Sequence, residues 1–408
     1  MASFSSSLFF LAVLFSAAHV QSGLVLPIRK DAKTSQFYTT IQMGSNRAKI
    51  NAVIDLGAQF LWFACNDYTS TTYAPIACGS SKCDMARGMG CVGCNLPPRP
   101  GCTNDTCGSP AYNPFQDALV AEGFAEDTLY SQKQAAVPQY LFSCMDSGFL
   151  EGLATGATGL LGLARTEISF HKQVAGKLNL LDKFSLCLPS SSGLGKLSVG
   201  QSAKSGISKT LKSTPLIINP VSTAPIYSEN DPSDEYFIDV KSIKVDGEAL
   251  SVKDSYFSID KNGVGGTKIS TIQNYTALHN SIYKPFTRAF VKAASDMKIK
   301  RVSAVPPFRA CFSSESIPRT SAGPSAPAID LVLPGNDVYW RINGANSLVD
   351  VDQKTTCLAF VDGGSNPRTS IVIGAHQLEE NFLEFDLVSS QLKFSSSLLV
   401  QNKSCSRL

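Results

Sequence analysis

The sequence predicts an all-β protein built as two mainly β lobes with a few short helices. Short runs rich in Val, Ile, Phe and Thr alternate with Gly, Pro, Ser and Asn along the chain, a pattern typical of strands joined by turns. About 385 residues remain after an N-terminal signal peptide, more than one hydrophobic core normally holds. A weak internal repeat places similar strand-and-turn patterns in both halves.

The N-terminus indicates the compartment. Residues Leu8–Ala18 are apolar and uncharged, too short a run to span a bilayer, and small residues follow them. The segment Met1–Ser7 contains no Lys or Arg. We interpret residues 1–22 as a signal peptide, cleaved near Ser22 or Ala18. Since no later segment approaches the length of a membrane helix, we expect a soluble, secreted protein with no membrane partner.

Strands and one helix can be placed along the chain. The clearest strand signals are Lys49–Asp55, Tyr236–Val245, Ile329–Leu333, Val338–Ile342 and Ser370–Gly374. The clearest helix is Ser281–Met297. Its apolar residues recur at helical spacing, and we interpret them as core packing: Tyr283, Phe286, Phe290, Val291 and Ala294.

The lobe boundary is predicted in the Ser/Lys/Gly-rich stretch Gly200–Ser213, giving an N-terminal lobe of residues 23–205 and a C-terminal lobe of residues 206–408. A new strand begins at Thr214–Pro220. The repeat consists of an apolar strand that leads into a turn, followed later by an apolar run that ends in Gly. In the first half these segments are 52–58 and 158–163, and in the second half 266–271 and 370–374.

Cysteine usage favours disulfides. The chain has twelve cysteines, an even number that suits six disulfides in an oxidising compartment. They are Cys65, Cys78, Cys83, Cys91, Cys94, Cys102, Cys107, Cys144, Cys187, Cys311, Cys357 and Cys405. The first seven form a Cys-rich insertion that we expect to pair mainly within itself and with Cys144. A zinc or redox motif at Cys91-Val-Gly-Cys94 is the alternative, but a second ligand pair is missing.

Other surface features fit a secreted glycoprotein. Three Asn-X-Ser/Thr sequons, at Asn104, Asn274 and Asn402, are candidate glycosylation sites. The net charge of +3 is small and gives no reason to expect a nucleic-acid partner.

Two turns could carry acid–base chemistry. The first apolar strand ends in Asp55-Leu56-Gly57-Ala58. About two hundred residues later, Gly265–Gln273 is the matching segment, and Ser270 occupies the position that corresponds to Asp55. A serine hydroxyl titrates far above pH 7, so it cannot share a proton with Asp55.

These turns resemble those of pepsin-like proteases, in which each lobe supplies an Asp-Thr-Gly-Ser/Thr turn. The resemblance implies a bilobal pepsin-like fold in which two carboxylates would share one proton. Here Leu56 and Ala58 replace the two hydroxyl residues of the first turn, and Ile272-Gln273 replace the Gly-Thr of the second. We therefore expect the first turn to lack the hydroxyls that would tie the turns together and hold the carboxylate, with Asp55 and Ser270 left as a vestigial pair and no catalytic residue.

The resemblance covers essentially the whole mature chain. The segment Gly374–Asn381 fits the turn and helix that precede the C-terminal strand of pepsin-like proteases. The segment from Asp386 to Phe394 fits that strand itself. The chain is most similar to the plant group of extracellular dermal glycoproteins, xylanase inhibitors, basic seed globulins and xyloglucan-endoglucanase inhibitors. The segments Ala52–Trp62 and Val361–Gly374 resemble the endoglucanase-inhibitor branch, whose members are apoplastic proteins that block microbial glycoside hydrolases. The resemblance also implies the disulfides Cys187–Cys405 and Cys311–Cys357.

No other catalytic pattern stands out. Outside the signal peptide only His171, His279 and His376 remain, and no Gly-X-Ser-X-Gly elbow supports a Ser-His-Asp triad. A His-Glu-X-X-His motif and a P-loop are also missing. We expect no metal and no cofactor.

The resemblance makes a glycoside hydrolase the expected partner, and xyloglucan-specific endo-β-1,4-glucanase the first target, with xylanase as the alternative. Such enzymes carry two acidic residues in a cleft, which an Arg or Lys on a rigid loop could bind. Candidate contacts are Arg319 in the loop Ser313–Ser325, and Lys403 and Arg407 in Gln401–Leu408. Surface solvation is the simpler interpretation of each charge. We expect a monomer; the alternatives are a non-catalytic storage or peptide-binding glycoprotein, and an active aspartic protease.

Overall fold

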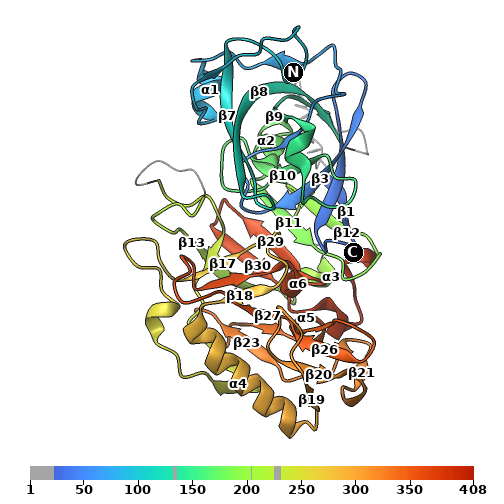
Figure 1. Cartoon of the computed structure of the whole chain (residues 1–408), viewed down its shortest axis with the longest axis vertical. Helices are drawn as coiled ribbons and strands as arrows, with labels where there is room; N and C mark the ends of the chain where they lie inside the picture. The colour runs from blue at the N-terminus through green and yellow to red at the C-terminus, as the bar shows by residue number, and fades with distance from the viewer. Residues whose placement is uncertain (1–22, 132–135, 204, 225–230) are drawn as a thin grey trace, which may run out of the picture.

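The structure is a computed structural model that describes residues 23–131, 136–203, 205–224 and 231–408. The expected signal peptide, residues 1–22, lies outside the described residues. The chain forms two mainly β lobes, one above the other in Figure 1, with the N-terminal half uppermost. The prediction of a two-lobed, mainly β chain with few short helices is confirmed.

The elements of the upper lobe precede residue 200. The strands are β1 Leu24–Lys30, β2 Phe37–Met43, β3 Ala48–Asp55, β4 Trp62–Ala64, β5 Ala74–Pro75, β6 Cys91–Val92, β7 Thr106–Asn113, β8 Ala118–Tyr130, β9 Ala136–Met145, β10 Gly159–Gly162, β11 Lys183–Cys187 and β12 Gly195–Val199. The helices are α1 Ser81–Met85, η1 Ser147–Leu150 and α2 Phe170–Lys177.

The remaining elements follow residue 204. The strands are β13 Lys212–Ile217, β14 Phe237–Ile238, β15 Ser242–Val245, β16 Glu248–Ala249, β17 Thr267–Ile269, β18 Thr276–Leu278, β19 Arg301–Val302, β20 Cys311–Ser313, β21 Arg319–Thr320, β22 Gly323–Pro324, β23 Ile329–Val332, β24 Tyr339–Ile342, β25 Leu348–Asp350, β26 Thr355–Leu358, β27 Phe360–Asp362, β28 Ile371–Ile373, β29 Phe382–Asp386 and β30 Gln391–Phe394. The helices are α3 Ser205–Ser208, η2 Asp254–Tyr256, α4 Asn280–Asp296, η3 Ser314–Ser316, α5 Gly344–Ser347, α6 Ala375–Leu378, η4 Leu398–Gln401 and η5 Cys405–Arg407.

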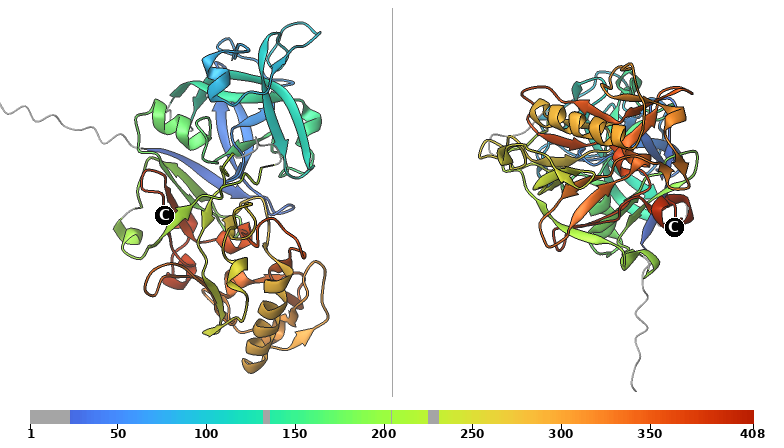
Figure 2. Two further views of the ribbon diagram at one scale, coloured as in Figure 1. Left: turned by 90° about the vertical axis from the view of Figure 1, so that its left-hand side faces the viewer. Right: turned by 90° about the horizontal axis from the view of Figure 1, so that it is seen from below.

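One antiparallel sheet joins the lobes. Its strands lie in the order β1, β12, β11, β29, β30 and β13. Strands from the two ends of the chain, β1 and the pair β29–β30, are thus separated by the strands β11 and β12 from its middle. Figure 2 shows this sheet in the middle of the molecule, between the two lobes. The predicted lobe boundary, after residue 205, falls in the connection between β12 and β13.

The internal repeat appears as two equivalent strand pairs. In the upper lobe β3 runs parallel to β10, with Asp55 opposite Gly162. In the lower lobe β17 runs parallel to β28, with Ile269 opposite Ile373. These are the segments whose sequences repeat, so the prediction of a repeat is confirmed. Each pair carries one of the two turns at the end of its first strand.

Most of the expected elements occur close to their predicted positions. The helix α4 buries Ile282, Tyr283, Phe286, Phe290 and Ala294, so its aromatic residues do pack in the core. The predicted strand 236–245 is in fact two strands: β14 pairs with β17, whereas β15 pairs with β23 in another sheet. The chain changes sheets between them, which a continuous β pattern does not reveal.

Six disulfides cross-link the chain, and all twelve cysteines take part. They are Cys65–Cys144, Cys78–Cys91, Cys83–Cys107, Cys94–Cys102, Cys187–Cys405 and Cys311–Cys357. Because Cys91 and Cys94 pair with different partners, the alternative of a zinc or redox motif at these residues is wrong. Within the described ranges, no helix is long and apolar enough to cross a membrane.

Candidate functional site

A pocket of about 410 Å³ lies between the two repeat turns. Asp55 and Ser270 both line it, one from each lobe. The hairpin of β7 and β8 contributes a further wall through Tyr112, Phe115 and Leu119. The two turns therefore meet at one cleft, as the resemblance implies.

Asp55 is held by its own turn. It is the last residue of β3, 5 % exposed, and its Oδ1 accepts the Gly57 N–H at 2.7 Å. Gly57 also permits a close approach from the other lobe, because a Cβ at this position would lie 3.0 Å from a Glu235 carboxylate oxygen. The carboxylate thus sits at the base of the cleft with little contact with water.

Ser270 has a structural role within the second turn. It follows β17, and its N–H donates to Ile373 O at 2.9 Å. Its side-chain oxygen accepts the Gln273 N–H at 3.2 Å. The hydroxyl therefore caps the turn, and it brings no ionisable group near Asp55 at neutral pH.

One tie between the turns survives, and it comes from the second turn, since Leu56 and Ala58 leave the first turn without hydroxyls. The buried Thr271 hydroxyl donates to Ile54 O at 2.7 Å and accepts the Leu56 N–H at 3.1 Å. This threonine follows Ser270 directly, in the position of the threonine in an Asp-Thr-Gly turn. Only the tie from the first turn is lost, because Leu56 stands there.

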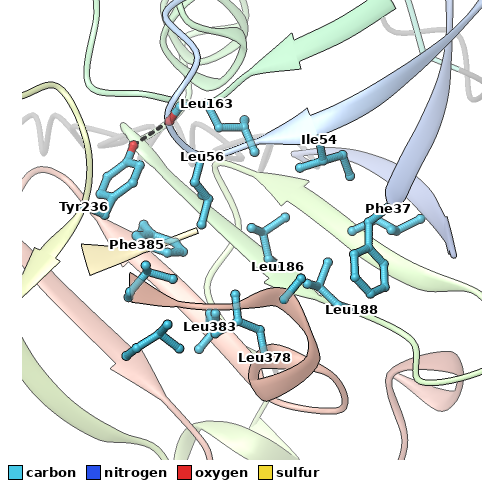
Figure 3. Close-up of a cluster of buried hydrophobic side chains, with 14 of the residues drawn as sticks. Phe37, Ile54, Leu56, Leu163, Leu186, Leu188, Tyr236, Leu378, Leu383 and Phe385 are labelled. Carbon is cyan, nitrogen blue, oxygen red and sulfur yellow. Dashed lines mark hydrogen bonds between the residues drawn. The ribbon is translucent and has the colours of Figure 1, made fainter. Parts of the chain in front are cut away.

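Leu56 takes part in hydrophobic packing instead. Its side chain is fully buried and points into the cluster that joins the lobes, where Figure 3 shows it near Tyr236 and Phe385. The Tyr236 hydroxyl donates to Leu163 O at 2.7 Å across the same boundary. A leucine here cannot make the inter-lobe hydrogen bond, but burying its side chain contributes about 2 kcal/mol.

Two further charged residues, which the sequence did not predict, line the cleft. Lys268 Nζ lies 2.8 Å from Glu235 Oε1, and Glu235 Oε2 accepts the Thr223 hydroxyl. Strand periodicity could have indicated Lys268, because residues two apart on a strand share a face and Ser270 follows it by two. No local pattern places Glu235 beside Asp55.

The Asp55 carboxyl has an unusual pKa. Burial raises it to about 6, with the nearby negative charge of Glu235 adding to the rise, while the Gly57 N–H and Lys268 act in the opposite direction. Asp55 is therefore neutral in acidic solution and ionised near pH 7.

One Ser-His-Asp arrangement does occur, but it lies in the core. His171 Nε2 is 3.0 Å from the Ser169 hydroxyl, and His171 Nδ1 is 3.2 Å from Asp182 Oδ1. Ser169 is 0 % exposed and its hydroxyl donates to Thr166 O, so no substrate can reach it. Of the other histidines, His279 caps α4 and His376 contacts Leu348 O. The described ranges contain no cluster of metal-ligating side chains.

The candidate inhibitory contacts lie in two separate places. Arg319 projects from the β21–β22 hairpin and already pairs with Asp350 at 2.6 Å. Lys403 and Arg407 both line a different pocket, beside the C-terminus. Lys403 Nζ donates to Gly206 O at 2.9 Å, whereas Arg407 is exposed and has no ion pair within the described part of the chain.

The three sequons differ in their surroundings. Asn104 and Asn402 are exposed. Asn274 lines a pocket other than that of Asp55, together with Tyr275 and His376. Its Nδ2 donates to Thr34 O of the upper lobe at 3.2 Å.

We expect Asn274 to carry no glycan, while Asn104 and Asn402 do. Glycosylation would attach a bulky sugar to the amide nitrogen that bonds Thr34 O between the lobes. Glycopeptide mapping of the secreted protein measures the occupancy of each sequon. The substitution Asn274→Gln should leave the protein's mobility unchanged, whereas Asn104→Gln should remove the mass of a glycan. A glycan on Asn274 would contradict this prediction.

Two β lobes joined by a shared sheet, each contributing a turn to one cleft, define a pepsin-like fold. Solved structures agree. A crystal structure of EDGP is 42 % identical, with a TM-score of 0.91, over 95 % of this chain and 98 % of that chain. Basic 7S globulin from soybean is 30 % identical, with a TM-score of 0.81, over the same shares.

The chain belongs to the xylanase inhibitor family. The model described as xylanase inhibitor N-terminal matches residues 37–201, and the one described as xylanase inhibitor C-terminal matches residues 235–396. Among curated relatives, a protein of Nicotiana benthamiana named probable aspartic proteinase GIP2 is 44 % identical over 94 % of this chain and 91 % of its own length. The resemblance to this plant group is therefore confirmed.

Proposed function

We propose that this protein is a secreted, non-proteolytic inhibitor of microbial glycoside hydrolases, with xyloglucan-specific endo-β-1,4-glucanase as the first target and xylanase as the alternative. Membership of the xylanase inhibitor family supports the class of partner. Six disulfides favour secretion into an oxidising compartment, which for this group is the apoplast or cell wall. The protein acts as a monomer that meets its target directly.

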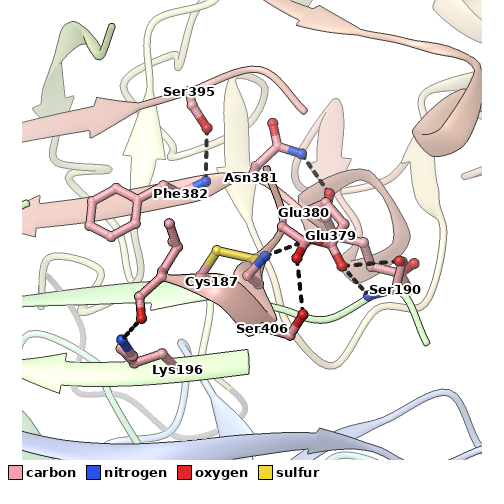
Figure 4. The surroundings of a disulfide bond; sticks show 12 residues. Cys187, Ser190, Lys196, Glu379, Glu380, Asn381, Phe382, Ser395 and Ser406 are labelled. Carbon is pink, nitrogen blue, oxygen red and sulfur yellow. Dashed lines mark hydrogen bonds between the residues drawn. A yellow bond between two sulfur atoms is a disulfide. The ribbon is translucent and has the colours of Figure 1, made fainter. Parts of the chain in front are cut away.

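The structural observation that carries the proposal is the anchoring of the C-terminal segment. Cys405 is bonded to Cys187, and its N–H donates to Glu380 Oε2 at 2.7 Å, as Figure 4 illustrates. Lys196 Nζ donates to Leu408 O at the end of the chain. Arg407 is therefore displayed by a fixed segment, so little entropy is lost when it binds.

The guanidinium of Arg407, which has no ion pair among the described residues, suits the acidic cleft of a glycoside hydrolase. Guanidinium groups bind carboxylates through two parallel hydrogen bonds, and such charge-assisted bonds are the strong ones. Lys403 from the same segment adds a second positive charge. Arg319 contributes less, because binding an enzyme carboxylate would require it to leave Asp350.

We expect Arg407→Glu to raise the inhibition constant about 10- to 100-fold, since charge reversal replaces attraction with repulsion. The measurement is the release of reducing sugar by a xyloglucanase and a xylanase at increasing inhibitor concentration. Arg288→Glu on α4 is the matched control, because it makes the same charge change on an exposed arginine elsewhere. Equal inhibition by both variants would assign the contact to other residues, and no inhibition by the native protein would refute the function.

We expect no proteolysis of denatured globin or casein from about pH 2 to about pH 6, because one carboxylate and a serine cannot share a proton. Ser270→Asp alone should also fail to cleave. It would place a new carboxylate near Asp55 without restoring the hydroxyl that Leu56 replaces. Mass spectrometry of released peptides measures proteolysis by the native protein and by Ser270→Asp. Cleavage that disappears in Asp55→Ala would show an active protease.

A non-catalytic storage or ligand-binding role is the second candidate, supported by the similarity to a basic 7S globulin. A panel of purified xyloglucanases and xylanases separates the two functions, because a storage protein should inhibit none of them.

A further inference from the structure

The cleft holds one buried negative charge that no cation neutralises. Among the residues that the structure describes, Asp55 forms no ion pair, while Glu235 is neutralised by Lys268 at 2.8 Å. Above the pKa of Asp55, the three groups together therefore carry one net negative charge. A buried charge without a partner is costly, and an incoming cation would recover part of that cost.

Apolar and aromatic side chains form part of the wall of the cleft on both sides. Trp62, Tyr112 and Phe115 line one side, and Ile272 and Val372 come from the opposite lobe. Aromatic faces attract cations when water is excluded, and a pocket of about 410 Å³ has the size of a small-molecule site. The surroundings therefore suit a positive group attached to an apolar body.

A buried polar group in the wall of the cleft has no partner among the described residues. The indole N–H of Trp62 is buried and makes no hydrogen bond in the described structure, and Trp62 is 1 % exposed. Leaving such a donor unpaired is unfavourable, so this wall of the cleft keeps an unsatisfied polar group.

We propose that the cleft between the lobes is a binding site for an organic cation with apolar flanks, a guanidinium, amidinium or ammonium group that pairs with Asp55. This site is separate from the C-terminal segment, since Lys403 and Arg407 line another pocket. The same chemistry is offered by a small organic cation and by a basic side chain within an apolar peptide. The protein binds the ligand without cleaving it.

Binding should depend on pH because it needs the ionised carboxylate. The charged and titratable groups that face Asp55 are Glu235, Lys268 from β17 and Tyr112 from β7. With the pKa of Asp55 raised to about 6, roughly one molecule in thirty is ionised at about pH 4.5. Affinity for the cation should therefore be about 30-fold lower there than at about pH 7.5.

The test compares each cation with its neutral isostere. Benzamidine and benzamide differ in charge and hardly in shape, and so do the capped peptides Leu-Arg-Leu and Leu-citrulline-Leu. Calorimetry and the fluorescence of Trp62 report binding; the other tryptophan, Trp340, is buried in the lower lobe against Phe394. We expect each cation to bind at least about 10-fold more tightly than its partner at about pH 7.5.

Two variants of the cleft should change affinity in opposite directions. Asp55→Asn should weaken cation binding about 10- to 100-fold and abolish the pH dependence, whereas Lys268→Met, which makes the cleft more negative, should strengthen it several-fold. Asp352→Asn is the matched control, because it removes an exposed carboxylate elsewhere. Thermal melting verifies that each variant is folded.

The peptide and the small cation distinguish the natural source, and binding of either one supports the site. Equal affinity for cation and isostere, unchanged affinity in Asp55→Asn, or no binding of either cation at millimolar concentration would overturn the proposal.

Discussion

Replacing Asp55 by asparagine is expected to raise the free energy of unfolding by about 2–3 kcal/mol at about pH 7.5. Burial raises the pKa of this carboxyl from 3.8 to about 6 in the folded protein. Between these two pH values the folded state holds a proton that the unfolded state has lost, so stability falls as pH rises through this window. Asparagine carries no charge at any pH, and its side-chain oxygen can still accept the Gly57 N–H.

Urea titrations at about pH 3.5 and about pH 7.5 would measure this effect. The gain should be present at the higher pH and nearly absent at the lower one, because Asp55 is then protonated in the folded state. Asp352→Asn, at an exposed position, provides the control for a general change in charge. A variant that is less stable than the native protein at neutral pH would contradict the prediction.

Removing the Cys187–Cys405 disulfide should have the largest effect on stability. These residues are 218 positions apart, and both are buried. In the chain-entropy model, closing so long a loop stabilises the folded state by about 5 kcal/mol. The double variant Cys187→Ser/Cys405→Ser should therefore melt at a much lower temperature, and it should release the segment that displays Arg407.

The control is a disulfide that closes a short loop. Cys94–Cys102 spans 8 positions, for which the same model gives only about 2–3 kcal/mol. Calorimetry of both double variants, together with the inhibition assay, separates stability from function. If the long-range pair cost no more than the short one, the unfolded chain would have to be compact around Cys187. If inhibition survived release of the C-terminal segment, Arg407 would not be the contact.

Much of the fold follows from local patterns. Strand periodicity, turn residues and chain length predict two mainly β lobes, and the repeated strand-and-turn segments are the ones that the structure pairs as β3–β10 and β17–β28. The helix from Asn280 to Asp296 follows from its apolar spacing. The break between β14 and β15 does not, because both segments have the same strand-forming composition.

The candidate site could be predicted only in part. The sequence locates Asp55 and Ser270 at equivalent turns, since each ends an apolar strand. It cannot show that Thr271 still bonds Ile54 O, because that contact joins residues 217 positions apart. Nor can it show the contact of Asn274 with Thr34, which depends on how the lobes face each other.

The sequence by itself determined the β class, the even set of cysteines and the replacement of one aspartate by Ser270, because each is a property of neighbouring residues or of composition. Only the tertiary structure decided which charges surround Asp55, which hydroxyl still ties the lobes and that Arg319 is paired with Asp350. Glu235 reaches the cleft from a segment with no local signature of a site, and burial changes the pKa of Asp55 only once both lobes exclude water. Electrostatics and desolvation depend on distances between remote parts of the chain, and those distances exist only in the folded protein.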